Sequence, residues 1–244
     1  MKRLKLNNDL VFYSLVLCGY IAFSVLILNA YFLRSYQQTS SGSGTYFPTI
    51  VLDAGHGGMD SGAVGIDNVL EKDINLSIAL NLKDLFNISG FNVKMTREKD
   101  ESIHNEDSGT IRSQKVSDLK NRLNIINFDP NNLLISVHQN KFEDSKYKGA
   151  QVFYSNNNPL SKELAQSMRA SFVGLLQKDN NREIKPSPKG VFILNKSTVP
   201  AVIVECGFLS NTKECSDLCN DEYQTALANA ICNAVCTWHE QHAK

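Results

Sequence analysis

The feature of this sequence that most constrains its fold is an alternation of short apolar runs with helical patterns. The apolar runs are short and almost continuously apolar, as strands buried on both faces are. They cover residues 49–52, 91–95, 133–137, 150–154, 191–194 and 201–204, and helical patterns fall at 70–86, 116–128, 161–176 and 223–238. We therefore predict a single α/β domain over residues 49–244, with a mostly parallel twisted sheet of about six strands and helices on both faces.

The first 48 residues do not fit this alternation. Residues 1–10 are basic, and residues 11–33 contain no charged side chain. An apolar stretch of this length is long enough to cross a bilayer, and its basic flank predicts a cytoplasmic N-terminus and an exported remainder. The alternative is a cleaved signal peptide, which also predicts export. Residues 34–48 are rich in Ser, Thr, Gly and Gln, which predicts a flexible linker.

Charge balance and cysteine spacing narrow the function classes only a little. Lys plus Arg and Asp plus Glu number 25 each, so the sequence predicts no nucleic acid partner. Five cysteines follow the apolar segment, and Cys215/Cys219 and Cys232/Cys236 are each spaced i, i+4. Three interpretations stay open for them: small buried hydrophobic side chains, a disulfide between the two segments, or a four-cysteine structural zinc site.

A glycine-dense stretch follows the first predicted strand, with His56 at the junction. Glycines allow positive φ and let the backbone pass close to other groups. A histidine between a rigid strand end and an accessible loop is well placed for chemistry. The stretch lacks a Gly-Lys-Ser/Thr sequence, so it does not predict a phosphate-binding P-loop.

Three further polar residues are expected at the same edge of the sheet as His56. His138 ends the apolar run 133–137, and Glu205 ends the run 201–204. Ligands of parallel α/β sheets bind outside the carboxyl ends of the strands, where these side chains should meet. Glu71 shares the helical spacing of the following buried stripe, so its carboxylate should point toward the sheet. A carboxylate directed inward needs a cation or several hydrogen-bond donors.

Two neutral imidazoles and one carboxylate form the ligand set of a catalytic zinc, with the fourth position left for water. Glu205 would then act as general base toward that water and as acid toward a leaving amine. Each residue also has a structural interpretation. His56 and His138 would be hydrogen-bonded loop and strand-end residues, and Glu71 an acid favoured by the helix N-terminus. Glu205 would form a salt bridge with Lys196 or Arg97.

Cys206 introduces a different class of enzyme. A cysteine hydrolase would use Cys206 as nucleophile and His138 as base. Glu205 and Cys206 point to opposite faces of a strand, however, so only one of them enters the site readily.

Four motifs, taken in order, resemble the zinc-dependent N-acetylmuramoyl-L-alanine amidases of the amidase-3 family. They cover residues 52–63, 71–76, 136–140 and 200–211, and Thr96-Arg97 and Leu119–Arg122 also fit. The resemblance extends over about residues 49–240. It implies one Zn²⁺ per chain held by His56, Glu71 and His138, with Glu205 as the catalytic glutamate. Separately from the resemblance, Arg97 is a basic residue expected near the same edge and is a candidate for orienting carboxylates of the peptide. Gln139 departs from the family, which often has a small residue after this histidine.

A short catalytic domain behind an apolar segment is most similar to the spore-cortex amidases that help to form muramic δ-lactam. This similarity implies a membrane-anchored enzyme facing the cell wall or spore cortex, with peptidoglycan as substrate. The separation of the ligands along the chain and the unusual Gln139 motivate a further hypothesis, an activating partner protein. The rival from another class is a non-catalytic wall-binding protein with a structural metal.

Overall fold

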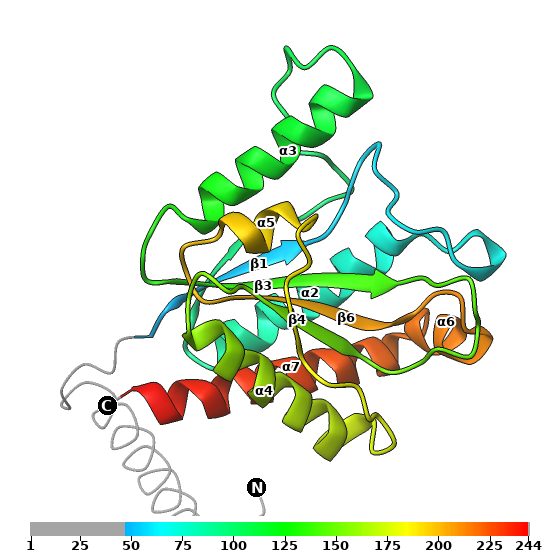
Figure 1. The fold of residues 1–244 in the computed structure, drawn as a ribbon, viewed down its shortest axis with the longest axis vertical. Helices are drawn as coiled ribbons and strands as arrows, with labels where there is room; N and C mark the ends of the chain where they lie inside the picture. The colour runs from blue at the N-terminus through cyan, green and yellow to red at the C-terminus, as the bar shows by residue number, and fades with distance from the viewer. Residues whose placement is uncertain (1–46, 244) are drawn as a thin grey trace, which may run out of the picture. The chain divides into compact units, whose positions relative to one another are not determined.

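One six-stranded sheet organises the part of the chain that the computed structural model describes, residues 47–243 (Figure 1). The strand order is β2-β1-β3-β6-β4-β5. The strands are β1 (Thr49–Ala54), β2 (Asn92–Met95), β3 (Asn132–Asn140), β4 (Gln151–Tyr154), β5 (Lys185–Pro186) and β6 (Ala201–Phe208). Neighbours in the run from β2 to β6 are parallel, and β4 is antiparallel to β6. A mostly parallel sheet is therefore confirmed.

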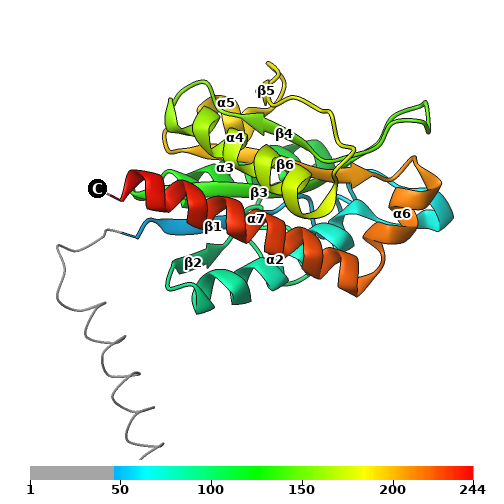
Figure 2. The ribbon, with the colours of Figure 1, turned by 90° about the horizontal axis from the view of Figure 1, so that it is seen from below.

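Helices cover both faces of this sheet (Figures 1 and 2). Helices α2 (Glu71–Ile88), α4 (Leu160–Ser171) and α7 (Asp221–His242) lie on one face, while α3 (Ile111–Ile126) and α5 (Phe192–Lys196) lie on the other. The remaining helical segments are η1 (Ile66–Asn68), the π-helix η2 (Phe172–Leu176) and α6 (Thr212–Leu218). Side chains alternate along β1 and therefore contribute to the apolar cores on both faces of the sheet. Ile50 and Leu52 face the core beneath α2, α4 and α7, and Val51 faces the core beneath α3 and α5.

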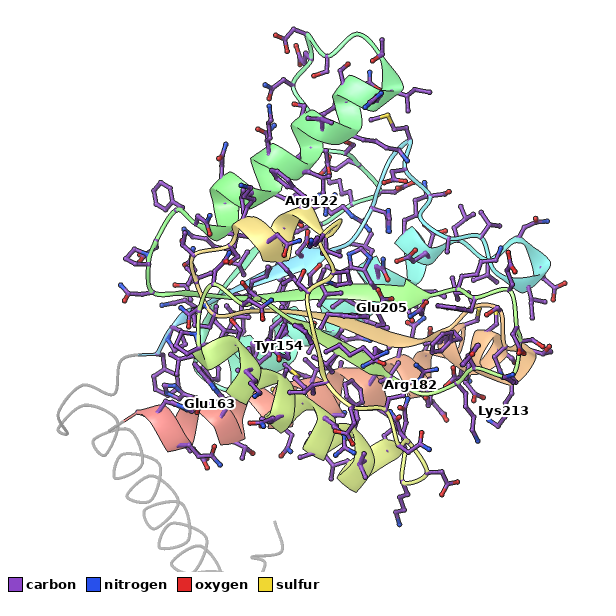
Figure 3. The ribbon with its side chains drawn as sticks, viewed as in Figure 1. Arg122, Tyr154, Glu163, Arg182, Glu205 and Lys213 are labelled. Atoms are coloured by element: carbon purple, nitrogen blue, oxygen red, sulfur yellow. The ribbon has the colours of Figure 1, made fainter. Side chains whose placement is uncertain are left out.

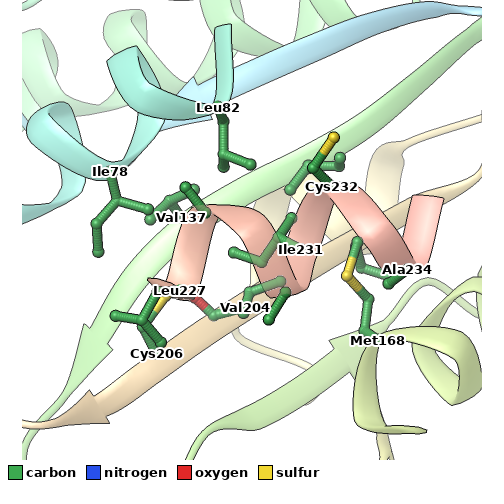
Figure 4. Packing of buried hydrophobic residues seen from close by; sticks show 14 of the residues in the cluster. Ile78, Leu82, Val137, Met168, Val204, Cys206, Leu227, Ile231, Cys232 and Ala234 are labelled. Carbon is green, nitrogen blue, oxygen red and sulfur yellow. Dashed lines mark hydrogen bonds between the residues drawn. The ribbon is translucent and has the colours of Figure 1, made fainter. Parts of the chain in front are cut away.

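The larger core lies beneath α7, which packs between α2 and α4 (Figure 4). Ile231 of α7 and Val204 of β6 are fully buried within it, and Cys206 and Cys232 fill space there. All five cysteines among the described residues are free thiols. The interpretation as small hydrophobic side chains holds for the buried Cys206, Cys215 and Cys232, and neither a disulfide nor a four-cysteine zinc site forms among residues 47–243.

Two predicted elements differ from the structure. The apolar run 191–194 was expected to be a strand, but Phe192–Lys196 form the short helix α5. Ile193 and Leu194 of α5 are buried against the sheet, and a short buried apolar run does not distinguish helix from strand by its periodicity. The sixth strand is instead β5, two exposed residues paired with β4. Helix α3 also begins earlier than predicted, at Ile111, where Thr110 and Ser113 form a capping box.

The predicted basic N-terminus (1–10), membrane segment (11–33) and most of the linker (34–48) lie outside the described residues. Phe47, which falls in the predicted linker, packs its ring against Phe91 and His239 at centroid distances of 5.0 and 4.4 Å. Within residues 47–243, no helix combines the length and apolar character that crossing a bilayer requires.

Candidate metal centre

Four side chains meet where the parallel strands end. His56 follows β1 by two residues, His138 lies near the end of β3, and Glu205 lies in β6 directly opposite His138. Glu71 is the first residue of α2. Figure 3 shows Glu205 on β6, close to the carboxyl end of β3. The predicted convergence of three strand ends and one helix start is therefore present.

His56, Glu71 and His138 form a cluster around the Glu71 carboxylate. Glu71 Oε1 lies 2.9 Å from His138 Nδ1 and 3.3 Å from His56 Nε2. One ligand atom from each residue lies within 4.8 Å of the others. Glu71 is only 3% exposed. Burial alone would raise the pKa of Glu71, but the two imidazoles outweigh it and hold that pKa well below its usual range. The carboxylate therefore points inward, as the helical spacing predicts.

The glycine-dense loop makes room for these rings. A Cβ atom on Gly55 would overlap the imidazole of His138, and one on Gly62 would overlap Glu71 and His56. His56 itself adopts a positive φ of 62°, which is uncommon for a residue with a side chain. Arg122 Nη2 donates to the His56 carbonyl at 2.7 Å and so stabilises this backbone conformation.

A carboxylate orients the His56 ring from outside the cluster. His56 Nδ1 lies 2.9 Å from Asp60 Oδ2, which leaves Nε2 facing Glu71. Lys115 Nζ donates to the other Asp60 oxygen at 2.8 Å. Burial lowers the pKa of His56, but the hydrogen bonds to Asp60 and Glu71 outweigh it and raise that pKa to about 9. A ring fixed by a carboxylate on its far nitrogen is the usual arrangement of a metal-binding histidine.

Asn75 and Gln139 orient the Glu71 carboxylate from the α2 side of the sheet. Asn75 Nδ2 donates to Glu71 Oε1 at 3.3 Å and to the Gly55 carbonyl at 3.2 Å. The backbone N–H of Gln139 donates to the same Glu71 oxygen at 3.1 Å, and the side-chain Nε2 of Gln139 donates to Asn75 Oδ1 at 3.2 Å. The side chain of Gln139 therefore points away from the His138 ring. Gln139 supports the carboxylate and does not crowd the cluster.

Glu205 differs from Glu71 because one oxygen of its carboxylate has no hydrogen-bond partner among residues 47–243. Its Oε2 atom is buried and makes no hydrogen bond. Burial is the largest influence and raises the pKa of Glu205 to about 7. Neither Lys196 nor Arg97, the partners that a structural role would require, forms a salt bridge with Glu205. A partly protonated carboxyl beside two imidazoles is suited to accepting and returning a proton near neutral pH.

Arg97 does not occupy the position expected of a residue that orients substrate carboxylates. It is 2% exposed, and its three guanidinium nitrogens donate to the carbonyls of Ala54, Gly55, Lys72 and Lys99. With its donors engaged in this way, Arg97 holds the glycine loop against α2. The expectation of a direct substrate contact is not supported, because the side chain is enclosed by backbone.

The cysteine-hydrolase interpretation is not supported by the position of Cys206. Its side chain is fully buried in the core beneath α7 (Figure 4). Because side chains alternate along β6, it lies on the face of the sheet opposite to Glu205. Burial raises the pKa of the Cys206 thiol well above its usual range, whereas a nucleophilic cysteine needs a lowered pKa and access to substrate.

Several supporting residues were missed from the sequence although spacing offered a signal. Asn75 lies four residues after Glu71 on the same buried stripe, and Asp60 lies four residues after His56. Asp53 and Arg122 form a buried ion pair at 2.7 Å beneath the cluster. A charged residue inside an otherwise apolar strand, as Asp53 is, signals such a partner because an unpaired buried charge is very costly.

The fold and the cluster together define an α/β enzyme whose site is suited to a divalent metal with two imidazole ligands and one carboxylate ligand. Comparison with known proteins identifies the family. The chain belongs to the N-acetylmuramoyl-L-alanine amidase family Amidase_3, whose model matches residues 50–237.

Individual proteins similar to this chain are also named as amidases. The germination-specific N-acetylmuramoyl-L-alanine amidase of Bacillus subtilis is 34% identical over 186 residues, which are 75% of this chain and 76% of that protein. The CwlD amidase from Clostridioides difficile, solved in complex with the GerS lipoprotein, is 43% identical with a TM-score of 0.76, covering 80% of this chain and 99% of that one. An N-acetylmuramoyl-L-alanine amidase from Clostridium difficile 630 is 30% identical with a TM-score of 0.69, covering 80% and 97%.

Proposed function

We propose that this member of the amidase family hydrolyses the amide between the lactyl group of N-acetylmuramic acid and the L-alanine of the stem peptide, with one zinc ion per chain. The observation that carries this proposal is the meeting of His56, Glu71 and His138 beside the unpartnered carboxylate of Glu205. Two imidazoles and one carboxylate match the ligand set of hydrolytic zinc sites. The inward direction of the Glu71 carboxylate fits the same assignment.

Zinc in such a site supplies a Lewis acid for the amide carbonyl and lowers the pKa of water to about 7. The chain's own residues do the rest. Glu205, with a pKa near 7, takes the proton from the attacking water and returns it to the leaving amine of L-alanine. Asp60 keeps the His56 ring in one orientation, and Asn75 and Gln139 do the same for Glu71. Held in this way, the ligands need little rearrangement during the reaction.

The setting that we propose is the cell wall or spore cortex, with a role in forming muramic δ-lactam. The similarity to a germination-specific amidase supports this role. We further propose that residues 11–33 anchor the exported chain in the membrane, since they are apolar, uncharged and preceded by basic residues. A partner protein is proposed because a similar amidase was solved in complex with a lipoprotein.

The experiment that tests the reaction measures both products of cleaving this one amide bond. Purified full-length chain is incubated with peptidoglycan, with and without a chelator. The proposal predicts new N-terminal alanine and peptide-free muramic acid in equal amounts, lost on chelation and restored by zinc. If the zinc-loaded chain binds peptidoglycan and releases neither product, alone or with the proposed partner protein, the chain is the non-catalytic wall-binding protein instead. Activity that survives chelation and disappears in Cys206→Ser would favour the cysteine hydrolase.

A further inference from the structure

A pocket of about 180 Å³ opens beside His56 and His138 on the α3 side of the cluster. Its lining combines apolar and charged side chains. Met59, Leu119 and Ile193 supply apolar walls. Such walls exclude water and strengthen the interaction between a charged substrate group and a charged side chain. The pocket therefore lies where part of a substrate held at the cluster would extend.

One arginine and one lysine line this pocket within the described part of the chain, and they differ in availability to a ligand. Arg122 is 2% exposed, and its nitrogens already donate to Asp53, Asp118 and the carbonyls of Ala54 and His56. Figure 3 shows Arg122 on α3, above the sheet. The side chain of Lys115, about two turns earlier on the same helix, is 48% exposed. Lys115 is therefore the cation that a ligand in the pocket can reach.

Lys115 also lies close to the reacting position. Its Nζ atom and His56 Nδ1 bind the two oxygens of the same carboxylate, Asp60, at 2.8 and 2.9 Å. The ammonium group is thus one carboxylate away from the imidazole that faces Glu71. An ammonium has three donors, and Asp60 is the acceptor that the structure gives to Lys115. Donors remain for a second oxyanion.

We propose that Lys115 forms a subsite for a free carboxylate on the residue that follows L-alanine in the stem peptide. This inference rests on the proposed function, which places the L-alanine amide at the cluster. An extended peptide advances about 3.5 Å per residue, so a stem peptide that runs from the cluster toward α3 brings its next residue beside the pocket. A carboxylate there gains a charged partner in Lys115, whereas a carboxamide at the same position gains only a neutral hydrogen bond. Lys115 is then a specificity-determining residue.

The test uses two muramoyl dipeptides that differ only at the second residue, one with a free carboxylate and one with a carboxamide. The measured quantity is the ratio of their kcat/KM values with the zinc-loaded full chain. We expect the unmodified protein to favour the carboxylate by about five-fold, the size of a partly exposed ion pair. Lys115→Gln should bring the ratio close to one, and Lys115→Glu should reverse it. Lys115→Arg should keep the preference, as should the matched control Lys120→Gln on the same helix.

The outcomes separate the subsite from the proposed reaction. If Lys115→Gln lowers kcat/KM equally for both substrates, Lys115 acts through Asp60 and His56, and the subsite is wrong. An unchanged ratio in Lys115→Glu would overturn it as well. If the unmodified zinc-loaded chain releases no peptide from either substrate, the proposed function fails. Zinc content, measured on each variant, shows directly whether a lost preference comes with a damaged cluster.

Discussion

Glu205 is the residue on which the proposed chemistry depends most. Its carboxylate lies opposite His138 and has a buried oxygen without a partner. Glu205→Gln keeps the shape of the side chain but removes the base. We expect kcat to fall by about 10²–10⁴-fold with zinc content unchanged. In the unmodified protein, activity should fall at acid pH, because protonated Glu205 cannot accept a proton. Bound zinc should move this fall below the pKa of about 7 that burial gives the metal-free carboxyl. A Glu205→Gln variant with normal kcat would exclude Glu205 as the base.

The buried carboxyl of Glu205 also lowers the stability of the metal-free protein. Its pKa is raised from 4.5 to about 7, so the folded state holds a proton that the unfolded state has lost between these values. Stability should therefore decrease as the pH rises through this range, and level off above it. We expect metal-free Glu205→Gln to be more stable than the unmodified protein at pH 8, by about 1–3 kcal/mol, and similar to it at pH 4. Urea unfolding at the two pH values measures this difference, and an equal difference at both would contradict it.

Asn75 should matter through Glu71, the proposed metal ligand whose carboxylate it orients. It is fully buried and bridges Glu71, Gly55 and Gln139. We expect Asn75→Ala to weaken zinc binding by about 10–100-fold, because the Glu71 carboxylate loses a donor that fixes its direction. Competition with a chromophoric chelator measures the affinity. Asn229→Ala, an exposed asparagine on α7, is the matched control and should bind zinc normally. Unchanged affinity in Asn75→Ala would show that backbone donors suffice.

The sequence predicted the residues that chemistry places at the ends of strands. His56, His138 and Glu205 could be found in this way, and Glu71 followed from the spacing of its helix. Among the residues that act through another residue, Asn75 and Asp60 had a spacing signal, but Lys115 had none. Lys115 lies far from His56 along the chain and reaches it only through Asp60, which sequence spacing does not reveal. Arg97 was misplaced for the opposite reason, since a basic residue near the edge can be consumed by backbone carbonyls.

At the scale of elements, Arg122 joins α3 to the sheet and to the cluster. It pairs with Asp53 of β1 at 2.7 Å and Asp118 of α3 at 2.6 Å. Arg122→Met would leave both carboxylates without their cation, and Asp53 is fully buried. We expect a loss of about 3–5 kcal/mol in the free energy of unfolding. Urea unfolding measures it, with the exposed Arg112→Met on the same helix as control. A loss below about 1 kcal/mol would mean that the network tolerates its removal.

Helices and strands could be predicted from the sequence where the length of an apolar pattern and its periodicity indicated the same type of element. The long stripe of α2 and the apolar runs of β1, β3 and β6 could be assigned from periodicity. The run at 191–194 could not, because α5 is a single short buried helix with the same apolar content as a strand. Strand β5 carries no apolar signal, since both of its residues are exposed. The antiparallel direction of β4 depends on the path of the preceding loop, which composition does not encode.

At the scale of the whole molecule, zinc should be coupled to folding. A metal that binds only the folded chain stabilises it by about 2.7 kcal/mol when its concentration is 100 times the dissociation constant. We therefore expect chelation to lower the melting temperature of the unmodified protein and added zinc to restore it. His138→Ala, which removes one ligand of the cluster, should respond much less to either treatment. Calorimetry measures both, and an equal zinc response in His138→Ala would place the metal elsewhere.

The central claim is that three residues from separate parts of the chain bind a single zinc ion beside Glu205. Anomalous diffraction from crystals grown with zinc, collected on either side of the zinc absorption edge, tests it most directly. We predict one strong peak within bonding distance of His56, Glu71 and His138, about 2.0–2.2 Å from each ligand atom. A cluster that stays empty while zinc occupies another position, such as Cys215 of α6 and the following Cys219, would contradict the account.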